Sequence, residues 1–285
     1  INFENRVERG IKMYVSVAVM DTGIFRHMDF DTRIAGFADF VGRKKYLYDD
    51  NGHGTHVAGI IAGSGKGSNG KYRGIAPDTF LVSVKVLDKS GNGKIENVVE
   101  AAGWIIENKS AMNIRVVNIS FGTRAKMENG PAIETGEDDY ALIMAVEKMW
   151  DSGIVVVAAA GNNGPGNTSV TAPGISKKII TVGAFDDKNF FSGRGPTREC
   201  IVKPEVVVTG SNIIACNNHQ GRYSSKSGTS MAAPVVSGAV ARLIKNNPDI
   251  TPKEVKIWMK SCCKKINVPS EKQGWGVLDI RKFVT

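Results

Sequence analysis

The sequence predicts an α/β protein of three layers, in which a mainly parallel β-sheet lies between two layers of helices. Runs of β-branched residues alternate with segments of helical periodicity along most of the chain, which is typical of consecutive parallel β-α-β units. The 285 residues have a hydrophobic content of 42%, which is ample for a sizeable core. No internal repeat or separating linker interrupts the pattern, so we expect a single domain over residues 1–285.

The first half of the chain contains three predicted strands and two predicted helices. Residues 14–20, 80–87 and 116–120 are rich in valine and isoleucine and are predicted to be buried strands. A helix rich in small residues is expected to begin at His53. Apolar residues at helical spacing predict the second helix over residues 95–106.

The second half of the chain continues the alternation of strands and helices. Residues 126–139 are polar and predict an exposed loop, and residues 140–150 predict an amphipathic helix. A strongly apolar helix is expected over residues 235–244. Further strands are predicted at residues 154–160, 179–184, 206–208 and 212–215.

Composition argues against several classes of function. The formal net charge is +9, but the basic residues are scattered, and no basic helix face predicts a nucleic-acid site. No apolar run reaches the length of about eighteen residues that a membrane span needs. The four cysteines include no C-x-x-C pair, so we expect free, partly buried thiols rather than a zinc site.

Four polar residues stand where predicted strands end or predicted helices begin: Asp21, His53, Asn162 and Ser230. Taken singly, each has a structural explanation. Asp21 and Asn162 are typical of turns, and Ser230 is typical of a helix cap. His53 and His56 are three residues apart, but their H-x-x-H pattern lacks the glutamate of a zinc protease. We therefore expect His56 to be a packing or hydrogen-bonding residue.

Taken together, the motifs around these residues form a specific set. They are DTG at 21–23, HGTHVAG at 53–59, AAAGN at 158–162 and GTSMAAP at 228–234. The set resembles the signatures of the subtilisin-like serine proteases, and the chain order Asp, His, Ser is that of subtilisin. The resemblance extends from about residue 15 to the segment at 274–279. It implies a subtilisin-like fold and the activity of a serine endopeptidase.

The resemblance also implies a role for each residue. Ser230 Oγ would attack the peptide carbonyl, His53 would act as general base and then as general acid, and Asp21 would orient His53. The Asn162 side chain and the Ser230 backbone N–H would form the oxyanion hole. The rival α/β-hydrolase fold is disfavoured, because Ala232 replaces the last glycine of its G-x-S-x-G motif and because its acid and histidine follow the serine.

By the same resemblance, substrate would lie as an extended strand between the main-chain segments 91–93 and 120–122. Thr171 would lie at the base of the pocket for the residue before the cut, where the family often has glycine, and would make it shallower. Thr22 follows Asp21, so the second acid of the kexin-like branch is missing, and we expect cleavage after uncharged or apolar residues. Ile95, Val98 and Phe121 would suit a further apolar pocket, or are core residues. The implied substrate-binding residues are Gly91, Asn92, Gly93, Ser120, Phe121, Gly122, Ala159, Ala160, Gly161 and Thr171.

No cofactor is required for the implied chemistry. Calcium is common in the family and Asp29 resembles a family calcium ligand, but the loop at 64–73 contains no carboxylate, whereas calcium takes about six to eight oxygen ligands. Metal ligands are therefore left unassigned. We expect a monomer that acts on a protein or peptide substrate, made as a zymogen with a propeptide. The expected location is secreted or extracytoplasmic, with an intracellular one as the alternative.

Two other functions compete with a general protease. A catalytically silent scaffold of the same fold usually lacks a triad residue, and this chain keeps all of them. A dedicated maturation protease acting on one partner is not distinguished from a degradative enzyme by the sequence.

Overall fold

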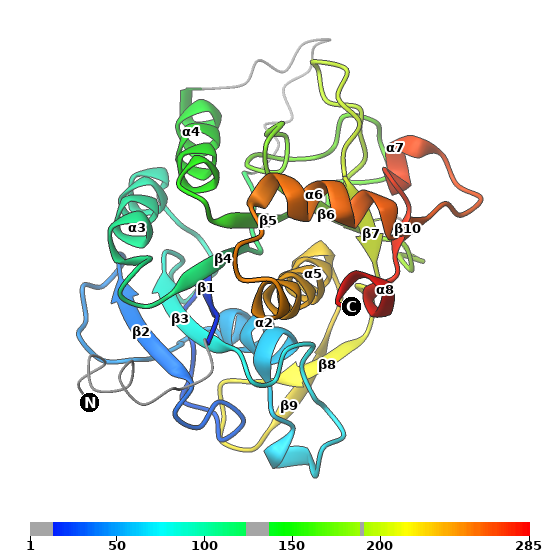
Figure 1. Cartoon of the computed structure of the whole chain (residues 1–285). Helices are drawn as coiled ribbons and strands as arrows, with labels where there is room; N and C mark the ends of the chain where they lie inside the picture. Colours follow the sequence, from blue (N-terminus) through cyan, green and yellow to red (C-terminus); the bar gives the residue numbers. More distant parts are fainter. Residues whose placement is uncertain (1–13, 124–136, 189–190) are drawn as a thin grey trace.

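The structure is a computed structural model that describes residues 14–123, 137–188 and 191–285 (Figure 1). Within these residues the centre is a nine-stranded sheet with the order β10-β11-β7-β6-β5-β4-β1-β3-β2. Its strands are β1 (Ser16–Asp21), β2 (Ile34–Asp39), β3 (Phe80–Lys85), β4 (Ile114–Ile119), β5 (Val155–Ala159), β6 (Ile180–Ala184), β7 (Val206–Val208), β10 (Cys263–Lys264) and β11 (Val277–Leu278). All neighbouring pairs in it are parallel except β10 and β11.

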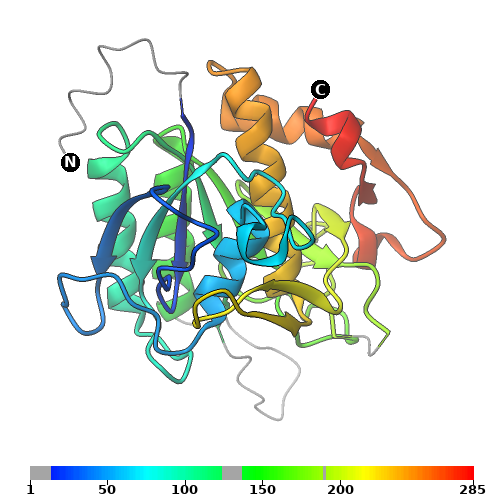
Figure 2. The same ribbon diagram turned by 90° about the horizontal axis from the view of Figure 1, so that it is seen from below.

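Helices cover both faces of the sheet, as Figures 1 and 2 show. One face carries α2 (His53–Ala62), α5 (Thr229–Asn246), α6 (Pro252–Ser261) and α8 (Ile280–Phe283). The other face carries α3 (Ile95–Asn108) and α4 (Glu137–Asp151). Two short elements complete the set, a 3₁₀ turn η1 (Lys66–Ser68) and the helix α7 (Ser270–Gln273), and β8 (Ile213–Cys216) pairs with β9 (Tyr223–Lys226) as an antiparallel hairpin. The predicted three-layer α/β fold is confirmed.

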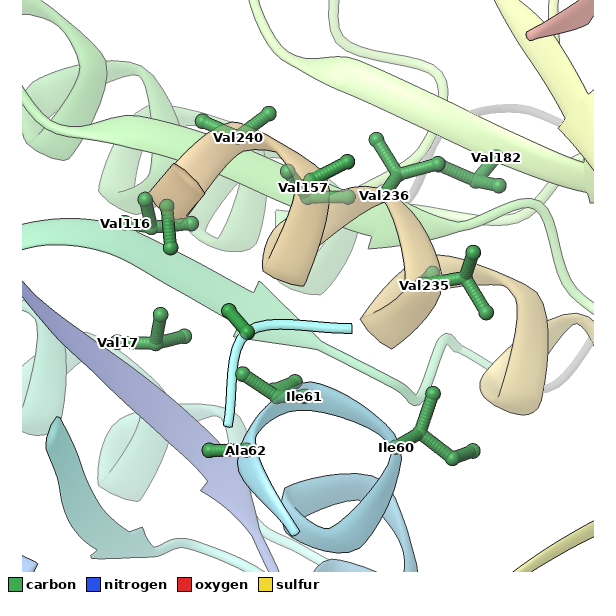
Figure 3. Close-up of a cluster of buried hydrophobic side chains, with 14 of the residues drawn as sticks. Val17, Ile60, Ile61, Ala62, Val116, Val157, Val182, Val235, Val236 and Val240 are labelled. Carbon is green, nitrogen blue, oxygen red and sulfur yellow. The ribbon is translucent and has the colours of Figure 1, made fainter. Parts of the chain in front are cut away.

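The protein has two hydrophobic cores, the first between the sheet and the α2–α5 face and the second between the sheet and the α3–α4 face. Both follow from the alternation of side chains along each strand. In β1, Val17 and Val19 face α2 and α5, whereas Ala18 and Met20 face α3 and α4. All four are fully buried, and such burial is the main force that holds helices against a sheet. Figure 3 shows the first core. Its labelled side chains are Val17, Ile60, Ile61, Ala62, Val116, Val157, Val182, Val235, Val236 and Val240.

Small residues allow the helices of the first core to approach closely. A Cβ on Gly59 in α2 would lie 2.8 Å from the backbone nitrogen of Cys216 in β8. A Cβ on Gly238 in α5 would lie 2.8 Å from Cβ of Ile75. Gly59 therefore allows α2 to pack closely against β8, and Gly238 allows α5 to pack closely against the segment after α2.

The predicted elements are present with shifts of a few residues at their ends. The exposed loop expected at 126–139 lies mostly outside the described residues, and its last three residues are helical, since α4 begins at Glu137. Sequence analysis missed β2, β9 and the short elements after α5. These elements are short or lack strong apolar periodicity, so tertiary contacts define them. None of the helices in the described part of the chain is long and apolar enough to cross a membrane.

Candidate active site

The fold places three of the four predicted catalytic residues at the ends of central elements. Asp21 is the last residue of β1, which lies between β3 and β4 in the sheet. His53 is the first residue of α2, and Ser230 is the second residue of α5. Helices α2 and α5 pack against each other and both contact β1. The carboxyl end of a central parallel strand is where open α/β sheets place their sites.

Asp21 and His53 form a direct pair. His53 Nδ1 lies 2.8 Å from Asp21 Oδ1 and 3.0 Å from Oδ2, and the Asp21 side chain is fully buried whereas that of His53 is 25% exposed. Burial by itself would lower the pKa of His53, but the charge and hydrogen bond of Asp21 outweigh it, so the pKa lies above 6.5. Asp21 therefore holds the ring with Nδ1 protonated and Nε2 free to accept a proton.

Ser230 is half-buried, and its hydroxyl is bonded to another partner than His53. Its hydroxyl donates to the backbone oxygen of Ser120 at 2.8 Å, and no hydrogen bond joins it to His53 within the described residues. Rotation about the Cα–Cβ bond of Ser230 has to move the hydroxyl from Ser120 before His53 can accept its proton. Staggered rotamers make such a rotation an ordinary event.

Pro234 explains how the start of α5 is shaped. Pro234 is the sixth residue of α5, beyond the first turn in which a missing N–H costs no hydrogen bond. The carbonyl of Ser230 therefore loses its normal partner four residues later. The Ser120 hydroxyl takes that place and donates to Ser230 O at 2.9 Å. Ser120 and Ser230 thus exchange two hydrogen bonds, and the Asn118 amide donates to Ser120 Oγ at 2.9 Å.

Asn162 is exposed and its side chain is oriented by the residue before Ser230. Asn162 Oδ1 accepts hydrogen bonds from both the backbone N–H and the hydroxyl of Thr229, each at 3.0 Å. The amide nitrogen then faces Gly228, where a Cβ would lie 3.2 Å from Nδ2. Gly228 has a φ of +147° and no side chain. The N–H groups of the Asn162 amide are therefore not covered on the side that faces the start of α5, where Ser230 lies.

The predicted pocket for the residue before the cut is partly assembled around Thr171. A Cβ on Gly122 would lie 2.2 Å from Thr171 Oγ1, and a Cβ on Gly161 would lie 2.7 Å from it. The Thr171 backbone N–H also donates to Ala160 O at 3.2 Å. Thr171 Oγ1 is buried and has no hydrogen-bond partner among the described residues. The side chain therefore fills the space between the two glycines, and its role at the base of a substrate pocket stays a prediction.

The remaining cleft residues are divided between the surface and the core. Gly91, Asn92 and Gly93 form an exposed turn, which the Asp88 N–H closes on Asn92 O at 2.7 Å. Val98 is 3% exposed within the core between the sheet and α3. It is therefore a core residue rather than part of an apolar pocket. Ile95 and Phe121 are half-buried, and Ala159 and Ala160 are buried in and after β5.

His56 has the structural role that its spacing predicted. Its Nε2 lies 3.1 Å from Ile213 O and 3.0 Å from Ser224 O, so it anchors the β8–β9 hairpin to α2. Burial lowers the pKa of His56 to about 4, which keeps the ring neutral at physiological pH.

Sequence reasoning missed several polar residues that support the site. They are Thr22 and Thr229, which act through their hydroxyl groups, together with Asp49 and with Lys85 in β3. Lys85 is the one of these with a visible signal, because a lysine interrupts an otherwise apolar strand and is only 1% exposed. The others are common turn and cap residues, so nothing in the sequence separates them from ordinary surface polar residues.

The surroundings of Asp29 do not fit calcium. Its carboxylate accepts hydrogen bonds from the backbone N–H groups of Gly65 and Gly67 at 3.1 and 2.8 Å, and from the Tyr223 hydroxyl at 3.0 and 2.9 Å. The thiol of Cys216 donates to it at 3.5 Å. These groups direct hydrogens at the carboxylate, whereas calcium needs oxygen lone pairs. Burial raises the pKa of Tyr223 to about 12, so its hydroxyl remains a donor.

A softer metal is no better served at this position. His27, Asp29 and Cys216 bring three potential ligand atoms within 4.8 Å of one another, all buried. However, His27 Nδ1 already accepts the Asp29 backbone N–H at 3.1 Å, and burial raises the pKa of the Cys216 thiol. All four cysteines are free, as expected.

Comparisons with known proteins identify the family of the chain. The model of the subtilase family, Peptidase_S8, matches residues 13–276. Serine protease AprX of Bacillus subtilis (strain 168) is 42% identical over 87% of this chain, and the chain spans 60% of its length. Subtilisin DY of Bacillus licheniformis is 35% identical, over 85% of this chain and 81% of its own length.

Solved structures show the same fold. A cold-adapted subtilisin-like serine proteinase has a TM-score of 0.73 and 30% identity, over 93% of this chain and 86% of its own. The S41 psychrophilic protease has a TM-score of 0.77 and 28% identity, over 93% and 90% of the two chains. With its family motifs, its fold and its relatives in agreement, the chain belongs to the subtilase family.

Proposed function

We propose that the chain is a serine endopeptidase that uses Asp21, His53 and Ser230 as its catalytic triad. The observation that carries the proposal is the contact of 2.8 Å between His53 Nδ1 and buried Asp21, with Ser230 at the start of the neighbouring helix. The sequence has all three triad residues, of which a silent scaffold usually lacks one. The test is a serine-directed phosphonate, which we expect to react with Ser230, as the Discussion describes.

The reaction follows from the properties of these three side chains. Ser230 Oγ attacks the carbonyl carbon of the substrate while its proton passes to Nε2 of neutral His53. The tetrahedral intermediate then collapses, the C–N bond breaks, and the leaving amine takes the proton from His53. In the second half of the reaction, water gives a proton to His53 and attacks the acyl group on Ser230. The bond to Ser230 Oγ then breaks, Ser230 takes the proton back from His53, and the carboxylic acid product leaves. Asp21 stabilises the imidazolium that forms in each half of the reaction.

The oxyanion of each intermediate needs donors that are already in place. We assign this role to the Asn162 amide and to the backbone N–H of Ser230, which lies in the first turn of α5. The first N–H groups of a helix have no partner within it, and the helix dipole favours negative charge there. Thr229 holds the amide carbonyl of Asn162 at 3.0 Å, so little reorganisation is needed when charge develops.

Specificity is proposed to favour uncharged or apolar residues before the cut. Thr171 occupies the space between Gly122 and Gly161, and none of these residues carries a charge that would bind a basic side chain. The test is a peptide library in which the residue before the cut is varied and each cleavage site is read by mass spectrometry. Faster turnover of Arg-Arg substrates than of Ala or Leu substrates would overturn this part of the proposal.

Replacing Thr171 by glycine is expected to deepen this pocket. The change removes the whole Thr171 side chain, whose hydroxyl and methyl group lie between two glycines. Larger substrate side chains therefore gain room in the pocket. We expect kcat/KM for Phe substrates relative to Ala substrates to rise by about 10-fold, the scale of one or two buried methylene groups. Thr171→Ser is the control and should change the ratio less. An unchanged ratio in Thr171→Gly would place the pocket elsewhere.

We propose that Asp29 is held by protein donors instead of calcium. Asp29→Asn is expected to lower the free energy of unfolding by about 3 kcal/mol, because hydrogen bonds to a buried charge are lost. EGTA should change the unfolding temperature of the wild type and of Asp29→Asn by the same amount. Differential scanning calorimetry checks both statements. An EGTA effect on the wild type that Asp29→Asn abolishes would show that Asp29 does bind calcium.

The biological setting of the chain is a further part of the proposal. We propose one monomeric peptidase domain that acts on protein or peptide substrates after removal of a propeptide, in a secreted or extracytoplasmic location. The Minor extracellular protease Epr of Bacillus subtilis (strain 168), 31% identical over 95% of this chain, supports the location by its name, although the chain spans only 38% of that protein. Library profiling also separates the two roles, because broad cleavage supports degradation and a single motif supports processing.

A further inference from the structure

Two polar residues next to the triad join its acid to its base. We propose that Thr22 and Asp49 are positioning residues that fix the end of β1 against the start of α2, and so hold Asp21 and His53 in reacting geometry. This inference rests on the proposed protease function, because it assigns to these residues an effect on the same reaction. Thr22 is fully buried and Asp49 is 6% exposed, and among the described residues neither side chain has a hydrogen bond to the His53 ring or to Ser230 Oγ.

Thr22 bonds the Asp21 carboxylate directly and reaches His53 through the next residue, Gly54. Its backbone N–H donates to Asp21 Oδ1 at 2.7 Å. Its hydroxyl accepts the backbone N–H of Gly54, the residue after His53, at 2.9 Å. The same hydroxyl donates its proton to Asp49 Oδ1 at 2.9 Å. Thr22 therefore bonds the catalytic acid through its backbone, and it links the residue after the base to a second buried carboxylate through its hydroxyl.

Asp49 accepts the hydrogen bonds that an N-cap side chain would normally accept at the start of α2, where no such side chain is present. The position before His53 is Gly52, which has a φ of +98° and no side chain to accept hydrogen bonds. Asp49 instead accepts the backbone N–H groups of Gly52 at 2.8 Å and of Thr55 at 3.0 Å. The Thr55 hydroxyl adds a third contact at 2.5 Å. A carboxylate in this place is stabilised by the helix dipole, and it fixes the first turn of α2, which carries His53.

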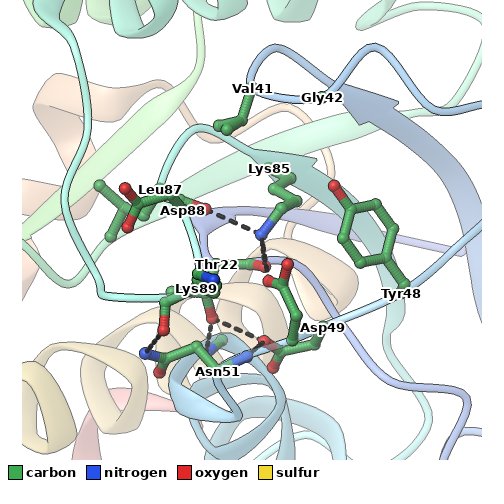
Figure 4. Close-up of polar contacts among 12 residues, drawn as sticks. Thr22, Val41, Gly42, Tyr48, Asp49, Asn51, Lys85, Leu87, Asp88 and Lys89 are labelled. Carbon is green, nitrogen blue, oxygen red and sulfur yellow. Dashed lines mark hydrogen bonds and ion pairs between the residues drawn. The ribbon is translucent and has the colours of Figure 1, made fainter.

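Lys85 holds Thr22 from the opposite side. Its buried ammonium group donates to Thr22 O at 2.6 Å, to Leu87 O at 2.9 Å and to Asp50 Oδ1 at 2.8 Å. Figure 4 shows Lys85, Thr22 and Asp49 converging from β3, from the end of β1 and from the loop before α2. The positive charge also offsets the cost of burying two carboxylates close together. Thr22 is therefore fixed at its backbone and at its hydroxyl.

The simpler explanation is that this network only stabilises the fold. The two explanations differ in what they predict for catalysis per folded molecule. Loss of the Thr22 hydroxyl leaves the buried N–H of Gly54 without a partner and frees the first turn of α2 to shift. Displacements of about 1 Å in a reacting pair cost up to about 100-fold in rate. A stabilising role alone would leave the rate of the folded molecules unchanged.

The experiment compares Thr22→Val, which removes the hydroxyl at constant shape, with Thr22→Ser, which keeps it. We expect Thr22→Val to lower kcat by about 10- to 100-fold, with KM within about twofold of the wild type. Thr22→Ser should stay within about threefold of the wild type. Ser16→Ala is the matched control, because it removes a buried hydroxyl bonded to Met112 O at the other end of β1. It should lower stability without lowering kcat.

A second readout does not depend on activity. The chain has four histidines, so the His53 imidazole can be followed by NMR titration in the Ser230→Ala background, where self-digestion cannot occur. The pKa of His53 is raised by Asp21, so a looser pair should lower it toward 6.5 in Thr22→Val but not in Thr22→Ser. The pKa of His56 should not move.

These outcomes separate the inference from the proposed function. A His53 pKa that is the same in Thr22→Val and in the parent overturns the positioning role, whatever the activity of the protein. Equal loss of kcat in Thr22→Val and Thr22→Ser also overturns it, because the hydroxyl would then not be the cause. If the wild type shows no peptidase activity while the His53 pKa falls in Thr22→Val, the proposed function fails and the positioning of His53 stands.

Discussion

Replacing Ser230 by alanine is expected to lower kcat for peptide hydrolysis by about 10⁴-fold or more, the scale of losing the nucleophile of a serine protease triad. KM should change little, because the hydroxyl makes few contacts with the substrate in the ground state. The Ser230→Ala protein should also fold, since Ser120 Oγ bonds the backbone oxygen of Ser230 rather than its side chain. Steady-state kinetics with a chromogenic peptide measures the effect.

The matched control for this change is Ser227→Ala. Ser227 is an exposed serine in the loop just before α5, and its hydroxyl accepts the backbone N–H of Asn212 at 2.8 Å. It should keep kcat within about threefold of the wild type, as surface changes away from a site usually do. Proteolysis that survives in Ser230→Ala after purification from other proteases would exclude Ser230 as the nucleophile.

Replacing Asn162 by leucine is the second change with a large expected effect. Loss of the equivalent amide from subtilisin, a member of this family, lowers kcat by about 10²–10³-fold, and we expect the same here, with KM within a few fold. The reason is that the amide meets charge that exists only in the transition state. The same kinetic assay with a peptide substrate measures it.

Asn163 provides the control for this prediction. It is the next residue in the same turn and is also exposed, but it makes no contact with Thr229. Asn163→Leu should keep most of its activity. If both variants lose activity equally, the effect comes from the turn and not from the Asn162 amide. If Asn162→Leu raises KM and leaves kcat unchanged, the amide binds the substrate in its ground state and is not an oxyanion donor.

Much of the site could be predicted because it lies at element ends that the sequence marks clearly. Asp21 follows a strand of β-branched residues, and Ser230 precedes a long apolar helix, so the fold class itself brings both to one region. The resemblance placed Thr171 at the base of the pocket that also contains residues 122 and 161, and the structure puts its hydroxyl against Gly122 and Gly161. These are consequences of hydrophobic periodicity and of specific local motifs, which a sequence displays directly.

What could not be predicted depends on contacts between residues far apart in the chain. Tyr223 reaches Asp29 across 194 residues and provides the donor that makes calcium unsuitable there. The Ser120 hydroxyl replaces the N–H that Pro234 lacks, which needs the distance between β4 and α5 to be known. The direction of the Ser230 hydroxyl is a rotamer choice, and no sequence pattern specifies it.

The most direct test of the proposed mechanism is the mass of the intact protein after treatment with a fluorophosphonate. Neutral His53 has to take the Ser230 proton before the reagent can react, so labelling reports on the triad as a unit. We predict one phosphonyl group per chain, found on Ser230 after fragmentation, and almost none in His53→Ala or Ser230→Ala. An unlabelled wild type, or a label on another residue that persists in Ser230→Ala, would contradict the account.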